Sequence, residues 1–157
     1  MVIAPIFELR PAGEADVPFL CAVRRSAMDP HLNEAGVFVN DLRNQELIRW
    51  RFDSVALIIL PAGNTPVGYV KIVREPPTWY LAQIAVLSHC QSRGLGTSVI
   101  RTILHDAATL RVGVVISVYK NNAGARSLYE RLGFEKTGED EREHLMQWNS
   151  RECQQRA

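Results

Sequence analysis

The sequence feature that most constrains the fold is a glycine-bearing turn, Gln91–Thr97, that lies between an apolar run and a helical pattern. Residues 79–87 predict a strand, and residues 97–110 predict a helix directly after the turn. Glycine lets a backbone approach an anion closely and adopt a positive φ. The first N–H groups of a helix lack partners within the helix, and the helix dipole favours negative charge there. Strand, turn and helix in this order predict a phosphate-binding loop.

Two widespread glycine loops do not fit this turn. A dinucleotide-binding fingerprint needs a third glycine at position 99, which is Val99, and a Walker loop needs a Gly-Lys-Ser/Thr triplet, which the sequence lacks. The remaining pattern is Gln-x-x-Gly-x-Gly, which fits a short pyrophosphate cradle. A glycine-bearing turn without a ligand stays open as the alternative on loop chemistry alone.

A second motif follows the next predicted strand, at residues 112–119. Its pattern is Asn-x-x-Ala-x-x-Leu-Tyr-x-x-x-Gly-Phe, and it falls on Asn122, Ala125, Leu128, Tyr129, Gly133 and Phe134. With the glycine turn, it resembles the GNAT superfamily of acyl-CoA-dependent N-acyltransferases. The resemblance covers roughly residues 67–148. The part of the chain up to about Asp53 matches only in general layout, and in this family that part usually shapes the acceptor pocket.

The resemblance implies a role for each motif residue. Backbone groups at 84–86 pair with the pantetheine arm like an added strand, and the Val86 N–H faces the thioester carbonyl. Tyr129 gives a proton to the departing thiolate, and Asn122, which caps its helix, contacts the pantetheine amide. The residues implied in acetyl-CoA binding are Ile84, Ala85, Val86, Gln91, Ser92, Arg93, Gly94, Leu95, Gly96, Thr97, Asn122, Ala125 and Tyr129.

The general base is the part of the family pattern that this sequence lacks. Many members carry a carboxylate on the strand before the loop, but residues 81–86 contain no acid, and Gln83 can only orient a water molecule. An alkylammonium has a pKa of about 10 and must lose its proton before attack. Candidates elsewhere are His31, Glu34, Glu75 and His144, of which His144 is favoured because imidazole titrates near neutrality. A water chain, or an acceptor that is already neutral, stays open.

The order of apolar patterns predicts a single α/β domain over residues 1–157, with a frayed tail at about 149–157. We expect a mixed, mostly antiparallel sheet of about six to seven strands with helices on both faces. The strands near Val86 and Tyr119 are expected to be parallel neighbours that, by resemblance, splay into the cofactor cleft. Expected strands lie at 7–10, 55–60, 67–73, 79–87, 112–119, 134–138 and 144–148, and expected helices at 14–28, 41–51, 97–110 and after Asn122. Asp29-Pro30 is expected to end the first helix.

Composition excludes several classes of protein. The 157 residues are 46% hydrophobic and 22% charged, which is typical of a folded domain, and the net charge of +1 argues against nucleic acid or an anionic membrane as partner. No apolar span or signal peptide is expected. Three scattered cysteines and four scattered histidines predict no metal site and favour a reducing, cytoplasmic compartment.

The sequence therefore predicts an N-acetyltransferase that moves an acetyl group from acetyl-CoA to a primary amine by direct attack in a ternary complex. The amine, a small molecule or a protein, is not identified, and a homodimer is a possible assembly because many relatives pair through their closing strands. A non-catalytic acyl-CoA-binding sensory or regulatory module is the main alternative, supported by the missing strand carboxylate. A CoA-free domain kept for protein contacts is a third reading, and the intact glycine pattern argues against it.

Overall fold

The computed structural model describes residues 6–91 and 93–150. Within these residues, seven strands form one sheet with the hydrogen-bonded order β1-β2-β3-β4-β5-β7-β6. β4 and β5 pair in parallel, whereas β1/β2, β2/β3, β5/β7 and β6/β7 pair antiparallel. This confirms the predicted α/β class with a mixed, mostly antiparallel sheet, and it confirms the parallel pairing of β4 with β5. The chain forms two compact units, at 6–72, 83–91 and 93–98, and at 73–82 and 99–150.

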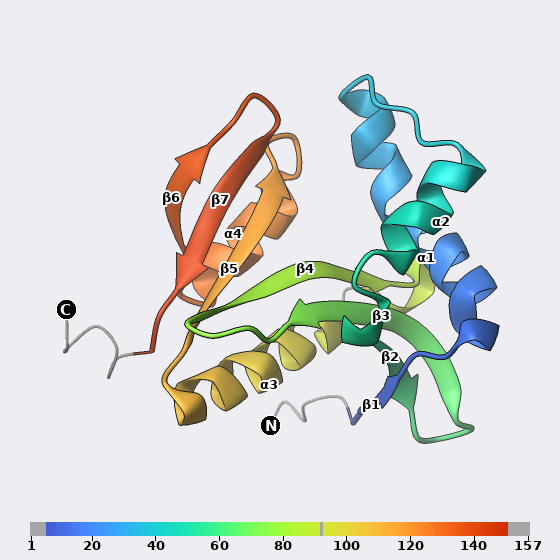
Figure 1. Cartoon of the computed structure of the whole chain (residues 1–157), viewed down its shortest axis with the longest axis horizontal. Coiled ribbons are helices and arrows are strands. Elements are labelled where there is room, and N and C mark those ends of the chain that lie inside the picture. Colours follow the sequence, from blue (N-terminus) through green and yellow to red (C-terminus); the bar gives the residue numbers. More distant parts are fainter. Residues whose placement is uncertain (1–5, 92, 151–157) are drawn as a thin grey trace. The chain divides into compact units, whose positions relative to one another are not determined.

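The first unit holds the N-terminal strands and helices and the strand end that leads into the glycine turn (Figure 1). Its helices α1 and α2 pack against each other. Its elements are β1 (Glu8–Pro11), η1 (Glu14–Asp16), α1 (Val17–Glu34), α2 (Asp41–Arg49), η2 (Phe52–Ser54), β2 (Val55–Leu60), most of β3 (Thr65–Val73), the end of β4 (Thr78–Val86), η3 (Ser88–Cys90) and the first turn of α3 (Leu95–Leu110).

The core of this unit forms around β2. Leu57, Ile58 and Ile59 are consecutive and all buried, so both faces of the strand are covered, as the continuous apolar run predicts. Leu20 and Val23 of α1 and Ile48 of α2 pack into the same cluster. One side of helix α1 therefore faces a core.

The predicted end of the first helix at Asp29-Pro30 is wrong, because α1 continues through Pro30 to Glu34. A proline inside a helix removes one hydrogen bond and costs about 3 kcal/mol. The extra turn buries Leu32, and burial of a leucine contributes about 1.5–3 kcal/mol. Arg25 also binds Asp29 at 2.9 Å and Asp41 at 2.6 Å, which ties this turn to the start of α2. These contacts offset the cost of the proline.

The second helix ends at Arg49, two residues earlier than predicted, where a buried cation meets its C-terminus. Lys71 of β3 is fully buried and donates to the carbonyl oxygens of Leu47 (2.8 Å), Ile48 (3.1 Å) and Trp50. A helix C-terminus carries unpaired carbonyls and partial negative charge, so the ammonium satisfies both. Burial and the charge of Arg24 lower the pKa of Lys71 to about 8, while the three carbonyl acceptors favour its charged form.

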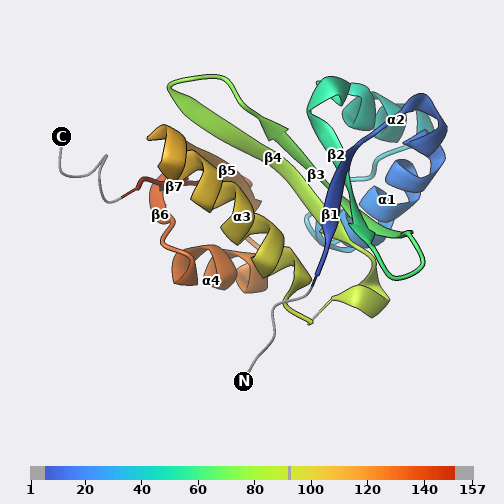
Figure 2. The same cartoon turned by 90° about the horizontal axis from the view of Figure 1, so that it is seen from below.

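The second unit is built on a three-stranded antiparallel section, β5-β7-β6, with α4 against one face of it (Figure 1, Figure 2). Alternate residues of β5 and β7 lie buried on the face that α4 covers. The opposite face carries partly exposed residues. The elements are the first half of β4, most of α3, β5 (Gly113–Tyr119), α4 (Ala123–Arg131), β6 (Glu135–Glu139) and β7 (Glu143–Trp148). The buried set is Val114, Ile116, Val118, His144 and Met146, and the other set is Val115, Ser117, Tyr119, Glu143, Leu145 and Gln147.

Helix α4 ends in a Schellman motif. Gly133 has φ +100°, its N–H donates to Glu130 O (3.1 Å), and the Phe134 N–H donates to Tyr129 O (3.0 Å). The rings of Tyr129 and Phe134 pack at a centroid distance of 5.8 Å, which is the hydrophobic contact that usually accompanies this motif. The motif glycine Gly133 is therefore a left-handed cap, and it fixes the end of the helix that carries Tyr129.

We predict that Gly133→Ala lowers the free energy of unfolding by about 1–2 kcal/mol, the cost of a left-handed conformation with a Cβ. The added Cβ would also lie 3.2 Å from Cδ1 of Trp148. Gly138→Ala is the matched control, because a Cβ there has nothing within 4 Å. Urea denaturation measures both. Equal stability of the two variants would contradict the strain assigned to Gly133.

Candidate functional site

The glycine turn places the N-terminus of α3 at the end of β4. Gly94 has φ +77°, which favours glycine, and its carbonyl accepts the first helical hydrogen bond from Ser98 N at 2.9 Å. The helix thus begins at Leu95, two residues before the predicted start, and the N–H groups at 95–97 have no acceptor within the helix. Arg93 is exposed beside them. Ser92, also predicted to bind the cofactor, lies outside the described residues.

The side chain of Gln91 has a structural task that the motif did not reveal. Its Nε2 donates to Val86 O at 2.9 Å, so the motif glutamine ties the turn back to the last residue of β4. The Leu87 N–H donates to Val67 O at 2.8 Å from the neighbouring strand. Together these bonds fix the backbone at 84–86, where the pantetheine arm was predicted to bind.

Gly68 of β3 was not singled out from the sequence, yet the end of β4 depends on it. A Cβ at Gly68 would overlap the carbonyl oxygen of Ala85 and lie 3.0 Å from Val86 Cα. Only glycine lets the two backbones approach this closely. A glycine inside the strand pattern Thr65–Val73 was the available signal, because a strand-interior glycine marks a bulge or a close backbone approach.

In the second unit, helix α4 determines the positions of Asn122 and Tyr129. The Asn122 side chain accepts from Ala125 N at 3.2 Å, which confirms it as the N-cap of the helix. Tyr129 is buried, and burial raises its pKa to about 12, so the phenol is neutral at physiological pH and keeps its proton. Among the described residues, no group forms a hydrogen bond with its hydroxyl.

His144, the favoured base candidate, lies buried beneath α4. Its Nε2 is 3.0 Å from Nη1 of Arg126, and because a guanidinium only donates, Nε2 carries the lone pair and Nδ1 the proton of a neutral ring. Nδ1 is buried with no hydrogen-bond partner in the described part of the chain, and lies 3.9 Å from Oε2 of Glu139. In this arrangement the one lone pair is already engaged, so a base role requires Arg126 to move.

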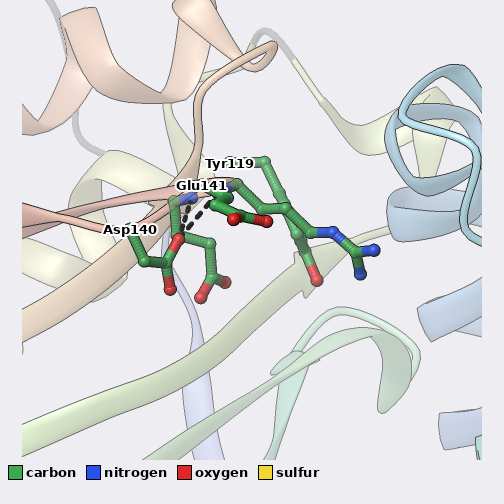
Figure 3. Close-up of a pocket in the computed structure, with 5 residues that line it drawn as sticks. Tyr119, Asp140 and Glu141 are labelled. Carbon is green, nitrogen blue, oxygen red and sulfur yellow. Dashed lines mark hydrogen bonds between the residues drawn. The ribbon is translucent and has the colours of Figure 1, made fainter.

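Glu143 directly precedes His144 on β7, so strand alternation places its side chain on the opposite face of the sheet. Glu143 lines a hollow of about 420 Å³ between the end of β5 and the β6–β7 turn, together with Tyr119, Asp140, Glu141 and Arg142 (Figure 3). Burial raises the pKa of Glu143, and the charge of Asp140 raises it further. Asp140 accepts from the N–H groups of Arg142 (2.8 Å) and Glu143 (2.7 Å), which lowers its own pKa.

The remaining base candidates of the sequence are dispersed. Glu34 is exposed at the end of α1, His31 is half-buried one turn earlier, and Glu75 is exposed between β3 and β4. Gln83 accepts a hydrogen bond from the Tyr69 hydroxyl at 2.9 Å, so its side chain is held in place within the first unit. Glu143 was not predicted from the sequence, because its burial and the nearby charge of Asp140 arise only in the folded chain.

Two wider findings concern the described residues. Between residues 6 and 150, position 92 aside, no three histidine, cysteine, aspartate or glutamate side chains group as a metal site would need. None of the described helices combines the length and the apolar character needed to cross a membrane.

Comparison with known proteins gives a family match and many similar folds. The model of the Acetyltransferase (GNAT) family matches residues 23–134. No curated protein matches the chain. An acetyltransferase from Thermus thermophilus has a TM-score of 0.73 at 19% identity, over 95% of this chain and 99% of that one.

Two further solved structures are similar at the level of the fold. The PaiA N-acetyltransferase from Thermoplasma acidophilum, solved in complex with coenzyme A, has a TM-score of 0.71 at 14% identity, over 92% of this chain and 99% of that one. The ribosomal-protein-S18-alanine N-acetyltransferase from Escherichia coli has a TM-score of 0.70 at 17% identity, over 92% and 94%. At these identities the likeness concerns the fold alone.

The environment of His144 predicts an acid-dependent loss of stability. Burial and the charges of Arg126 and Lys136 lower its pKa below 6.5, so as pH falls below that value the unfolded chain binds a proton before the native state does. The free energy of unfolding therefore falls with pH from about 6.5 until the lowered pKa is passed. We expect His144→Gln to flatten this slope in urea denaturation between about pH 5 and 8. His89→Gln, at an exposed position, is the control; an unchanged slope in His144→Gln would contradict the assignment.

Proposed function

The chain belongs to the Acetyltransferase (GNAT) family, and from that premise we propose that it is an N-acetyltransferase that moves an acetyl group from acetyl-CoA to a primary amine. The observation that carries this proposal is the start of α3, where Gly94 turns the chain so that the N–H groups at 95–97 find no acceptor within the helix. Such a helix start suits a pyrophosphate. We also propose a reducing, cytoplasmic setting and a single domain over the whole chain.

The end of β4 and the glycine turn would hold the acyl donor. Backbone groups of Ile84 and Ala85 would pair with the pantetheine arm as an added strand, and Arg93 would make a charge-assisted contact to a phosphate. The hydrogen bond from Gln91 to Val86 O and the close approach of Gly68 support a rigid strand end. The Val86 N–H would donate to the thioester carbonyl oxygen. A preorganised donor of this kind contributes about 2.7–4 kcal/mol in other enzymes.

By its place in the family motif, Tyr129 would supply the proton for the leaving thiolate. Tyr129 is neutral, buried, and held by the Schellman motif at the end of α4. A phenol that keeps its proton at neutral pH can give it to sulfur as the carbon–sulfur bond breaks. Asn122 would contact the pantetheine amide while it caps the helix.

A non-catalytic acyl-CoA-binding module is the second candidate. Two observations favour it: residues 81–86 of the strand before the loop contain no carboxylate, and the lone pair of His144 is engaged by Arg126. Such a module would bind acetyl-CoA with the same loop and release no thiol. A homodimer formed through the closing strands fits either function.

A charge placed in the loop tests acetyl-CoA binding. A Cβ at Gly96 has nothing within 4 Å, so Gly96→Glu and Gly96→Gln add side chains of equal size without a steric clash at Cβ. We expect Gly96→Glu to bind acetyl-CoA at least about tenfold more weakly than Gly96→Gln, because the carboxylate competes for the anion site. Calorimetric titration with acetyl-CoA and desulfo-CoA measures the affinities. Equal affinities of the two variants would contradict the proposal that this loop binds the pyrophosphate.

The acid role of Tyr129 separates the enzyme from the sensor. With an amine panel and free-thiol detection, we expect Tyr129→Phe to bind acetyl-CoA normally and to lower kcat more than tenfold, as loss of a general acid does. Phe134→Leu is the control for packing, since it alters the ring contact and keeps the hydroxyl. Thiol release by the wild type with none of the amines would favour the sensor. Full activity of Tyr129→Phe would contradict the role of Tyr129 as the general acid.

A further inference from the structure

The side-chain amide of Gln83 on β4 is held in one orientation by a buried phenol. The Tyr69 hydroxyl donates to Oε1 of Gln83 at 2.9 Å, and the Tyr69 side chain is fully buried. Burial raises the pKa of Tyr69, so the phenol keeps its proton and needs an acceptor for it. Because an amide accepts only through its oxygen, Oε1 faces Tyr69 and the NH₂ group points away from it.

The Nε2 of Gln83 is a hydrogen-bond donor that the fold leaves unused. No group in the described part of the chain accepts from it, and Gln83 is only half-buried, so Nε2 stays open to solvent. Gln83 lies three residues before Val86 on β4, about 10 Å along the strand, and both belong to the first unit. The glutamine side chain and a short acceptor together can cover this distance. An acceptor whose nitrogen reaches a thioester at the Val86 N–H can therefore place a second group at Nε2.

The surroundings of Tyr69 carry positive charge without a matching carboxylate. Arg24 of α1 and Lys71 of β3 are both buried, and neither forms an ion pair with an acid among the described residues. The charge of Arg24 opposes the effect of burial on the pKa of Tyr69, so it acts at short range there. Arg24 donates to Asn44 at 3.0 Å, but its buried Nε has no hydrogen-bond partner within the described residues. This uncompensated charge favours an anionic group over a cationic one beside Tyr69.

We propose that Gln83 selects the acceptor: its Nε2 donates to a carboxylate oxygen of the substrate, which is therefore an amine that also carries a carboxylate. This inference rests on the proposed transferase function and names the substrate class of that same site. The hydrogen bond is charge-assisted because the accepting oxygen is ionised. The buried charges of Arg24 and Lys71 favour the same carboxylate and disfavour a substrate with a second ammonium group.

The test uses pairs of amines that differ only in the carboxylate: glycine with methylamine, β-alanine with ethylamine, γ-aminobutyrate with propylamine, and phenylalanine with phenethylamine. Free-thiol release from acetyl-CoA gives kcat/KM for each, and the ratio within a pair measures the preference for the carboxylate. Gln83→Glu keeps an acceptor for Tyr69 and replaces the donor by a negative charge. We expect it to lower the ratio at least about tenfold, mainly through KM, as loss of a hydrogen bond to a charged group does.

Gln45→Glu is the matched control, because it makes the same substitution at an exposed position of α2. It should keep the ratio of the wild type. A comparison of ratios also removes the effect of each amine's own pKa, which is the same for every variant. A merely structural role of Gln83 would change kcat/KM for both members of a pair alike and leave the ratio unchanged.

A second variant keeps the test decisive if Gln83→Glu fails to bind acetyl-CoA in calorimetry and so has lost its fold. Tyr69→Phe retains Gln83 but removes the phenol that orients its amide, and it should also lower the ratio. An unchanged ratio in the folded variant, or a wild type that acetylates only the amines without a carboxylate, overturns this inference and leaves the transferase in place. A wild type that releases no thiol with any amine overturns the proposed function and this selectivity together.

Discussion

The close approach of β3 to β4 at Gly68 is the constraint on which the donor half of the candidate site depends. Because the backbone of β3 lies against Ala85 O and Val86 Cα, the end of β4 has no freedom to shift toward its neighbour. The Leu87–Val67 bond and the Gln91 side chain then fix the direction in which the chain leaves the strand. The turn at Gly94 and the start of α3 follow from that direction. A backbone held in this way can present N–H groups to a ligand without reorganising.

In the second unit, the ionisable side chains on the two faces of the sheet have different surroundings. On the face covered by α4, the phenol of Tyr129 and the ring of His144 are buried, and burial favours the neutral form of each. On the opposite face, Glu143 stands in a charged, partly solvated hollow. Burial disfavours the charged form of a side chain, so a buried phenol keeps its proton and a buried imidazole stays neutral. A neighbouring negative charge raises the pKa of a carboxyl group. Strand alternation at a single pair of residues produces this division.

Burial of two cations shapes the first unit in a way that composition does not suggest. Lys71 ends α2 by binding its carbonyls, and Arg24 donates to Asn44 between α1 and α2. Neither has a carboxylate partner among the described residues, so backbone and amide oxygens provide the compensation. The net charge of +1 does not reveal that two of the positive charges are interior.

Local sequence was enough to predict the strand, turn and helix around Gly94 and the cap at Asn122. These depend on the φ preferences and hydrogen bonds of a few adjacent residues, so a short window contains their cause. The folded chain was needed to show that α1 continues through Pro30, that the Gln91 side chain bonds to Val86 O, and that Glu143 rather than His144 lines a hollow. Each of these depends on burial, charge or close approach that arises only in the folded chain, which no local pattern carries.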